Sequence, residues 1–313
     1  MLNRRYLRVK VMQALYAYFQ SDDNDISKSE KDLLSSIDKV YELYAYLLTL
    51  LTELTYQSGK IIEEAKSKKL PTQADLTPNT KFIDNLLIKK ISENKQLVRE
   101  VANRKVSWQT EGELVRKILT NIKASDAYQV YMTNTGCTYE EDKKFIIEIY
   151  KECIAEFDLL EHFFELRSIY WIDDMRLVNS VILKSFENSS ETFELPLVSL
   201  YKDEAEDKQF VIDLFRKTIN TEKESEKYIS EKTKNWEVDR IALMDVLLMK
   251  MSITEILHFT SIPVKVSLNE YIEISKMYSS PKSKIFINGI LDKLVQDFKE
   301  QNILQKTGRG LIE

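Results

Sequence analysis

The stretch that decides the fold is residues 262–294, IPVKVSLNEYIEISKMYSSPKSKIFINGILDKL. Pro263 ends the segment before it. Ser267 and Glu270 have the S-x-x-E spacing of a capping box, which predicts a helix that begins there and runs to about Met277. Taken together, these signals predict the first of two consecutive helices.

A second helix is predicted directly after the first. Ser280 followed by Pro281 is the arrangement expected at an N-cap and the first helical position. Apolar residues then recur at helical spacing and predict one long buried face: Phe286, Ile287, Ile290, Leu291, Leu294, Val295 and Phe298. Gly289 in this helix costs about 1 kcal/mol relative to alanine, which suggests that another backbone or a ligand comes close.

The N-terminal stretch NRRYLRVKVMQALYAYFQ, residues 3–20, predicts a basic amphipathic helix. Its apolar face is formed by Leu7, Val11, Ala14, Leu15 and Tyr18. The first twenty residues carry no acidic side chain and four basic ones, namely Arg4, Arg5, Arg8 and Lys10. Taken alone, such a cluster is more often the solvated end of a helix than a binding site.

Length and composition indicate a cytoplasmic, globular protein. A chain of 313 residues is a soft prior for two domains, and 43% hydrophobic residues is ordinary for a soluble protein. No run of about 18 apolar residues could span a bilayer, and the basic N-terminus does not resemble a signal peptide, so we expect no membrane segment. Cys137 and Cys153 have neither metal-site nor disulfide-framework spacing.

The charge of the chain is unevenly placed. The net charge of -5 would count against nucleic-acid binding, but residues 137–174 hold eleven acidic and four basic side chains, whereas the two ends are basic. The C-terminal stretch contributes Lys265, Lys276, Lys282, Lys284 and Lys293.

The chain contains an internal repeat in which a phenylalanine is followed by a tryptophan 26 positions later. The three pairs are Phe82 and Trp108, Phe145 and Trp171, and Phe210 and Trp236. Apolar residues follow each tryptophan at the same offsets: Leu114, Val115, Ile118 and Leu119; Leu177, Val178, Val181 and Ile182; Ala242, Leu243, Val246 and Leu247. Each unit is interpreted as a helix that starts near the Phe, a turn around the Trp and a second helix with its stripe facing inward. The tryptophans are predicted to lie in the core.

Strand signals are scarce, and residues 33–69 and 143–167 have helical patterns throughout. The predicted fold class is all-α.

The motifs at the two ends of the chain, NRRYLRVKVMQALY and IP-x-KVS-x-NE-x-IE with F-I-N-G-I-L-D-K, resemble those of the transcription antitermination factor NusB family. The resemblance implies a helical bundle of NusB type with additional repeated helical hairpins. It covers residues 1–21 together with 188–302, leaves 22–187 as an inserted all-helical region with two further copies of the repeat, and leaves 303–313 as a polar tail. This chain would be a long variant.

What the resemblance implies is binding to single-stranded boxA-type RNA of ribosomal RNA transcripts, together with the ribosomal protein NusE, within the RNA polymerase antitermination complex. No catalysis and no cofactor are implied. The expected RNA-binding residues are Arg4, Arg5, Arg8, Tyr16, Lys282, Ser283, Lys284, Phe286 and Asn288. The expected partner-binding residues are Asp239 and Asp245. Tyr6 stands where the family often has a further arginine, and its ring could stack on a base.

Both basic clusters lie in the first turn of a predicted helix, where cations oppose the helix dipole while free N–H groups favour an anion. We therefore expect the starts of the first and last helices to form one RNA groove.

Three other interpretations of the sequence were compared with this one. Some proteins fuse a NusB-like domain to an RNA methyltransferase, but no nucleotide-binding motif or alternating strand and helix pattern occurs here. Glu255 and His258 have E-x-x-H spacing, although a di-iron bundle needs two such pairs. The remaining alternative is a non-catalytic helical adaptor that binds proteins and has lost RNA binding.

Overall fold

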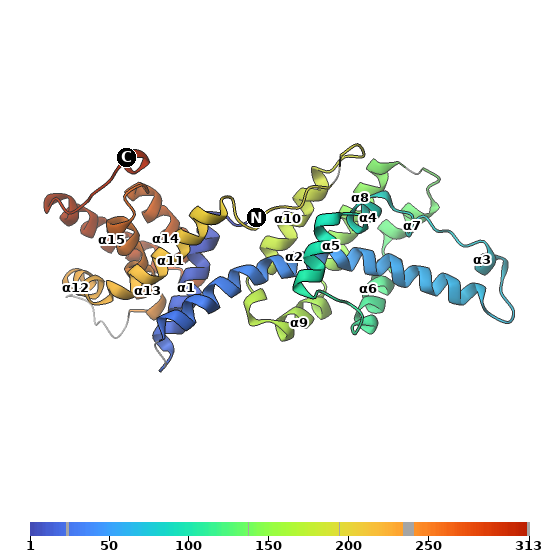
Figure 1. Cartoon of the computed structure of the whole chain (residues 1–313), viewed down its shortest axis with the longest axis horizontal. Helices are drawn as coiled ribbons and strands as arrows, with labels where there is room; N and C mark the ends of the chain where they lie inside the picture. Colours follow the sequence, from blue (N-terminus) through green and yellow to red (C-terminus); the bar gives the residue numbers. More distant parts are fainter. Residues whose placement is uncertain (23–24, 137, 194, 234–240, 312–313) are drawn as a thin grey trace. The chain divides into compact units, whose positions relative to one another are not determined.

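In the described residues the computed structural model is all-α and contains no strand, which confirms the predicted fold class (Figure 1). The residues described are 1–22, 25–136, 138–193, 195–233 and 241–311. The chain forms two compact units: a middle unit of residues 38–200 joined by Met1, and a terminal unit of residues 2–37 and 201–313. None of the described helices is long and apolar enough to cross a membrane.

The terminal unit is a bundle built around α1 and α13. Its helices are α1 (Arg4–Gln20), the start of α2 (Ile26–Lys66), α11 (Glu204–Asn220), α12 (Glu222–Lys232), α13 (Leu243–His258), α14 (Val264–Tyr278) and α15 (Ser283–Glu300). Every residue of α13 from Leu247 to Ile256 is buried, and α1 packs against α11, α13 and α14. A helix that is apolar on all sides is expected at the centre of a bundle.

The predicted apolar face of α1 is largely confirmed, because Leu7, Val11, Leu15 and Tyr18 are buried and Ala14 is half-buried. The helix begins after Asn3, whose side chain accepts a hydrogen bond from the backbone N–H of Tyr6 at 3.0 Å. Such a cap contributes about 1 kcal/mol to helix stability.

Both C-terminal helices exist, but their predicted starts were wrong. Helix α14 begins at Val264, directly after Pro263, because the hydroxyl of Ser267 is turned into the core instead of capping the helix. Helix α15 begins at Ser283, after a turn that contains Pro281. Its buried face follows the prediction except at Phe286, which is half-buried. Gly289 is exposed with open space around it, so no described backbone approaches it.

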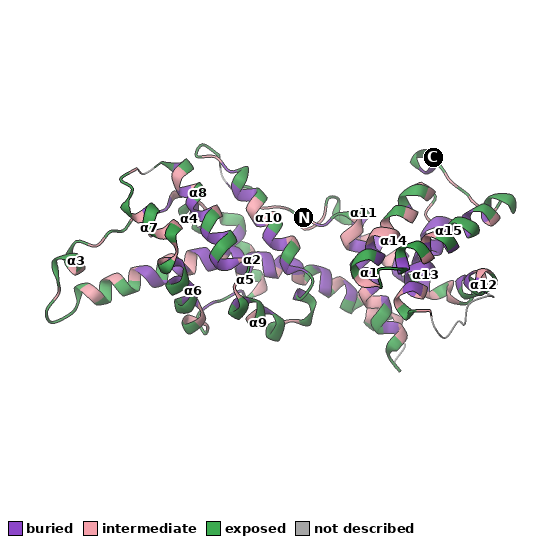
Figure 2. Ribbon diagram, turned by 180° about the vertical axis from the view of Figure 1, so that it is seen from behind, coloured by how far each residue is buried: buried purple, intermediate pink, exposed green. Residues whose placement is uncertain are grey.

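The middle unit is organised around the rest of α2, whose central turns are buried on all sides (Figure 2). The other helices are α3 (Gln73–Leu76), α4 (Leu86–Ser92), α5 (Lys95–Arg104), α6 (Gly112–Ala124), α7 (Asp126–Thr133), α8 (Tyr139–Ile149), α9 (Asp158–Arg167) and α10 (Met175–Glu187), with the π turn η1 (Tyr150–Ile154) and the 3-10 turn η2 (Ile169–Trp171). The predicted single helix over 143–167 is therefore broken between η1 and α9.

Two of the repeated tryptophans meet at one residue of α2. The rings of Trp108 and Trp171 lie 5.5 and 5.8 Å from the ring of Tyr46. The indole N–H of Trp108 donates to the carbonyl of Tyr46 at 3.2 Å, and that of Trp171 donates to the carbonyl of Lys39 at 2.8 Å. The core role predicted for these two tryptophans is confirmed, whereas Trp236 lies outside the described residues.

The internal anatomy of the repeat differs from the prediction. Phe82 precedes α4 in a turn and Phe145 lies within α8, so the phenylalanines do not mark helix starts. After Trp108 and Trp171 the stripe is mainly inward, but Leu243 is 46% exposed in the first turn of α13, before the fully buried stretch that begins at Leu247.

The two compact units divide the chain at 37/38 and 200/201, whereas the family resemblance implies divisions at 21/22 and 187/188. Residues 26–37 of α2 belong to the terminal unit, where Glu30 pairs with Arg216 of α11 at 3.0 Å. The predicted polar tail also packs: Thr307 donates its N–H to the carbonyl of Thr260 at 3.0 Å. A Cβ on Gly310 would lie 1.9 Å from that carbonyl, so only glycine fits there.

Candidate nucleic-acid interface

The first turn of α1 carries two arginines and no acidic residue, which is the charge pattern that opposes a helix dipole. Carboxylates from neighbouring helices of the terminal unit compensate the positive charge of these arginines. Arg4 pairs with Glu206 and Asp207 of α11 at 2.7 and 2.9 Å, and its guanidinium lies 4.4 Å from the ring centre of Phe210. The side chain of Arg4 remains one-third exposed.

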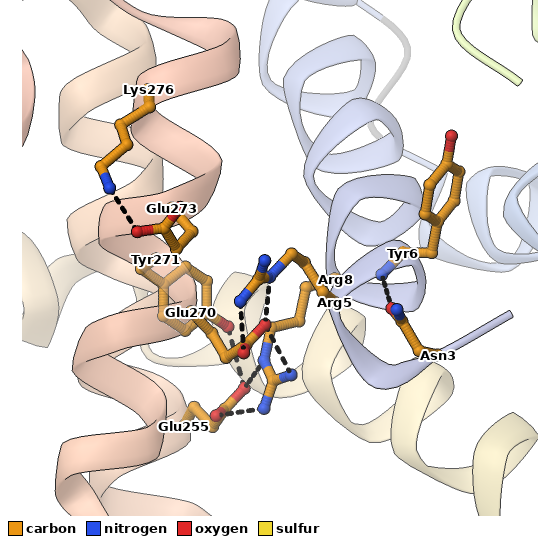
Figure 3. A network of polar contacts seen from close by, with 9 residues as sticks. All are labelled: Asn3, Arg5, Tyr6, Arg8, Glu255, Glu270, Tyr271, Glu273 and Lys276. Atoms are coloured by element: carbon orange, nitrogen blue, oxygen red, sulfur yellow. Dashed lines mark hydrogen bonds and ion pairs between the residues drawn. The ribbon is translucent and has the colours of Figure 1, made fainter. Parts of the chain in front are cut away.

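Arg8 lies inside the bundle, in a two-pronged ion pair with Glu255 of α13 (Figure 3). Both N–O distances are 2.7 Å, and the side chains are 2% and 0% exposed. The hydroxyls of Ser267 and Tyr271 on α14 also donate to the Glu255 carboxylate, at 2.6 and 3.1 Å. The network thus ties α1, α13 and α14 together, and Arg8 does not reach the surface.

Burial and charge act in opposite directions on this network. Burial by itself would lower the pKa of Arg8, but the charge and hydrogen bonds of Glu255 raise it above its ordinary value. The pKa of the Tyr271 phenol is raised well above 10, first by burial and then by the negative charge of Glu255. At neutral pH the phenol therefore stays protonated and remains a donor.

Arg5 lies one turn nearer the start of α1 and reaches the surface. It donates two hydrogen bonds to Glu270 of α14 at 2.8 and 2.9 Å, and its side chain is 42% exposed (Figure 3). The same carboxylate lies 3.8 Å from the guanidinium of Arg8. One turn further along α14, Glu273 pairs with Lys276.

Charges from both α1 and α15 act on Glu273 of α14. Its pKa is lowered first by the hydrogen bond from Lys276, and further by the positive charges of Arg5 on α1 and Lys284 on α15. Both cations are therefore close enough to α14 to act on one carboxylate. The cations that act on this carboxylate, Arg5, Lys276 and Lys284, define what is called the α1–α15 surface below.

The turn before α15 is held by Asp245, near the start of α13. Asp245 is 5% exposed, and it accepts hydrogen bonds from the hydroxyls of Ser279 and Ser283, the latter at 2.8 Å. Ser283, 2% exposed, is also 2.8 Å from the hydroxyl of Ser280. A residue expected at the protein partner's face thus contacts a residue expected on the RNA side.

Ser283→Ala is expected to lower the free energy of unfolding by about 1–2 kcal/mol, because it removes a buried hydrogen bond to a charged acceptor. Hydrogen exchange of residues 279–285 should speed up. The matched control is Ser280→Ala, since Ser280 is exposed. Equal effects of the two substitutions would show that the Asp245 contact does not hold this turn.

The remaining expected site residues are placed as follows. Lys282 and Lys284 are exposed and form no ion pair with any described residue, whereas Phe286 and Asn288 are half-buried, Asn288 donating to Asp292 at 2.8 Å. Tyr16 is 42% exposed. Asp239 lies outside the described residues.

The sequence did not identify the carboxylates that face the arginines. Glu270 was assigned to a capping box, and Glu255 was considered for E-x-x-H chemistry, but its carboxylate is taken up by Arg8, Ser267 and Tyr271. The spacing of the charged residues in the sequence could have indicated these ion pairs. Arg5 and Arg8 are three residues apart on α1, and Glu270 and Glu273 are three apart on α14, so each pair lies on one side of its helix.

Comparison with known proteins gives the family. The NusB family model matches residues 177–296, from α10 through most of α15. This chain carries a NusB-family domain. Over 105 residues it is 46% identical to the transcription antitermination protein NusB of Salinibacter ruber, a match that spans 34% of this chain and 66% of that protein.

Two further NusB proteins match this chain at lower identity. That of Chloroherpeton thalassium is 40% identical over 106 residues, which is 34% of this chain and 50% of that protein. That of Natranaerobius thermophilus is 33% identical over 92 residues, which is 29% of this chain and 66% of that protein. The chain thus covers between half and 66% of these NusB relatives. No solved structure matches.

Proposed function

We propose that this protein is a non-catalytic transcription antitermination factor whose terminal unit binds single-stranded boxA-type RNA of ribosomal RNA transcripts together with the ribosomal protein NusE. A single observation carries the proposal: the positive charges of Arg5 on α1 and of Lys284 on α15 both lower the pKa of the same carboxylate, Glu273. The starts of α1 and α15 would therefore present cations near one another, α15 lying within the part of the chain that matches the NusB family model.

The α1–α15 surface suits a phosphate backbone. Lys282 and Lys284 have no ion pair among the described residues, so they could bind phosphates without first breaking an ion pair. Arg4 and Arg5 are partly exposed, and RNA phosphates would replace Glu206 and Glu270 as their anions. Phosphate near the free N–H groups of a helix start is favoured by the helix dipole.

The other expected residues take different roles. Tyr16 and Phe286 would offer rings to unstacked bases, and Asn288 would supply hydrogen bonds to a base or a phosphate. Arg8 is proposed to position α1 against α14, since its guanidinium is buried against Glu255. Ser283 would act through the turn that it forms with Asp245.

The proposal includes assembly with NusE and with RNA polymerase in an antitermination complex. Asp239 and Asp245 are the residues proposed for the NusE side, where the buried Asp245 would act through the turn that it holds with Ser283. Because a ribosomal protein is generally basic, acidic groups at that contact would speed association more than they tighten it.

A transcription assay tests the proposed function. Purified polymerase with NusE would transcribe a template carrying a terminator downstream of boxA, with and without this protein, alongside a template in which boxA is scrambled. Read-through should rise only when both the protein and boxA are present. If the protein binds NusE but raises read-through on neither template, the adaptor interpretation replaces this one.

A further inference from the structure

Helix α9 and the turn η2 of the middle unit expose an unusual group of apolar side chains. Within residues 159–172 lie five large apolar side chains that are exposed: Leu159, Leu166, Ile169, Tyr170 and Ile172. Leu166 and Ile169 are each 76% exposed. Isolated exposed leucines are ordinary, but several within one short segment mark an interaction surface. In Figure 2 most of α9 is drawn as exposed.

The exposed residues of α9 form two ridges. Leu159 and Leu166 are seven residues apart and so lie on one side of the helix, while Leu160 and Phe164 are buried on another. Asp158, Glu161 and Glu165 follow the same helical spacing and form a second ridge beside the leucines. An apolar ridge and an acidic ridge therefore face solvent together.

The turn that continues the apolar ridge is anchored to the core. Trp171 is 1% exposed, its ring lies 5.5 Å from that of Phe164, and its indole N–H is bonded to the carbonyl of Lys39. Ile169 and Ile172 are therefore presented on a fixed turn. A preorganised surface loses little conformational entropy when it binds.

The negative charge of the acidic ridge is not compensated within the described residues. Asp158 and Glu161 form no ion pair there, and the nearest cationic partner of Glu165 is His162 at 3.8 Å. The one arginine of the helix, Arg167, lies over the ring of Tyr46 at 4.8 Å. Acidic residues in the first turn of a helix also interact favourably with the helix dipole, but that role does not account for the exposed leucines beside them.

We propose that the α9–η2 surface docks a positively charged amphipathic helix of a partner protein, with apolar side chains on the leucine ridge and lysines or arginines along the acidic ridge. Nucleic acid and anionic membranes would be repelled by the acidic ridge. A second copy would bring a surface of the same negative charge to the contact, which opposes association. Only a basic partner satisfies both ridges at once.

The test uses the full chain and a labelled probe: a synthetic amphipathic helix of leucine and lysine, compared with the same peptide carrying glutamate for lysine. The lysine peptide should bind and the glutamate peptide should not. Leu166→Ser with Ile169→Ser should weaken binding at least roughly tenfold, since it removes apolar surface that the peptide would cover. Asp158→Asn with Glu161→Gln should reduce the salt dependence.

The matched control is Val98→Ser with Val130→Ser, two exposed apolar residues of the same unit outside the surface. These should change affinity by less than about twofold, as expected for surface positions away from the contact. The proposal is overturned if the lysine peptide does not bind, if both peptides bind equally, or if the control pair weakens binding as much as the α9–η2 pair. It is equally overturned if Leu166→Ser with Ile169→Ser abolishes self-association of the chain, because the surface would then hold a second copy.

Discussion

Arg8→Met is expected to lower the free energy of unfolding of the terminal unit by about 3–5 kcal/mol, because it leaves the carboxylate of Glu255 buried without its cation. Glu255 is fully buried, and its remaining donors, Ser267 and Tyr271, are neutral. The loss should appear in urea unfolding, and hydrogen exchange of α1 and α14 should accelerate because both helices are tied to this pair.

Arg5→Met provides the matched control, since Arg5 also makes a two-pronged pair with a glutamate, but at the surface. An exposed pair contributes about 0–1 kcal/mol, so the control should change stability little. Replacing both partners, Arg8→Met with Glu255→Leu, should recover part of the loss, because no unpaired charge then stays buried. If Arg8→Met costs no more than Arg5→Met, the buried pair does not hold the bundle together.

Arg5→Glu combined with Lys284→Glu is expected to weaken binding of boxA-type RNA roughly a hundredfold, since a hydrogen bond to a charged group contributes about 1.5–3 kcal/mol and each reversal adds repulsion. The two residues come from α1 and α15, so the effect depends on both helix starts facing the same RNA. The slope of log K against log salt should become shallower by about 1.4, as the loss of two single-strand phosphate contacts implies. Fluorescence titration over a salt series measures both quantities.

The control for this variant is Lys223→Glu with Lys227→Glu, two exposed lysines of α12 that form no ion pair among the described residues. It changes the net charge by the same amount on the same unit. A general effect of charge would make the two variants equal, and that result would contradict the α1–α15 surface. Circular dichroism of both variants checks that the fold is retained.

The helices could largely be predicted from the sequence, because helical periodicity is a local signal. The apolar faces of α1 and α15 and the core positions of Trp108 and Trp171 follow from residue spacing alone. The start of α14 was missed because Ser267 has the local pattern of a cap, while its hydroxyl makes a tertiary hydrogen bond to Glu255 that no local pattern reports.

The residues of the candidate site were predicted from the sequence, but their burial and their ionic partners could not be. Residue type identifies Arg4, Arg5 and Arg8 as cations, but only the packing of α1 against α14 separates the buried Arg8 from the exposed Arg5. Asp245 is a similar case. Its acidic character suggested a surface contact, whereas its burial beside Ser283 depends on how α13 meets the turn before α15.

The central claim is that the terminal unit recognises boxA-type RNA, and equilibrium binding to boxA and to a base-scrambled RNA tests it most directly, with and without NusE across a salt series. We expect boxA to bind more tightly than the scrambled RNA, NusE to strengthen that binding, and log K to fall with log salt at a slope near -3, as about four single-strand phosphate contacts imply. Equal binding of the two RNAs, or no RNA binding alongside a stable complex with NusE, would contradict the claim and leave a protein adaptor.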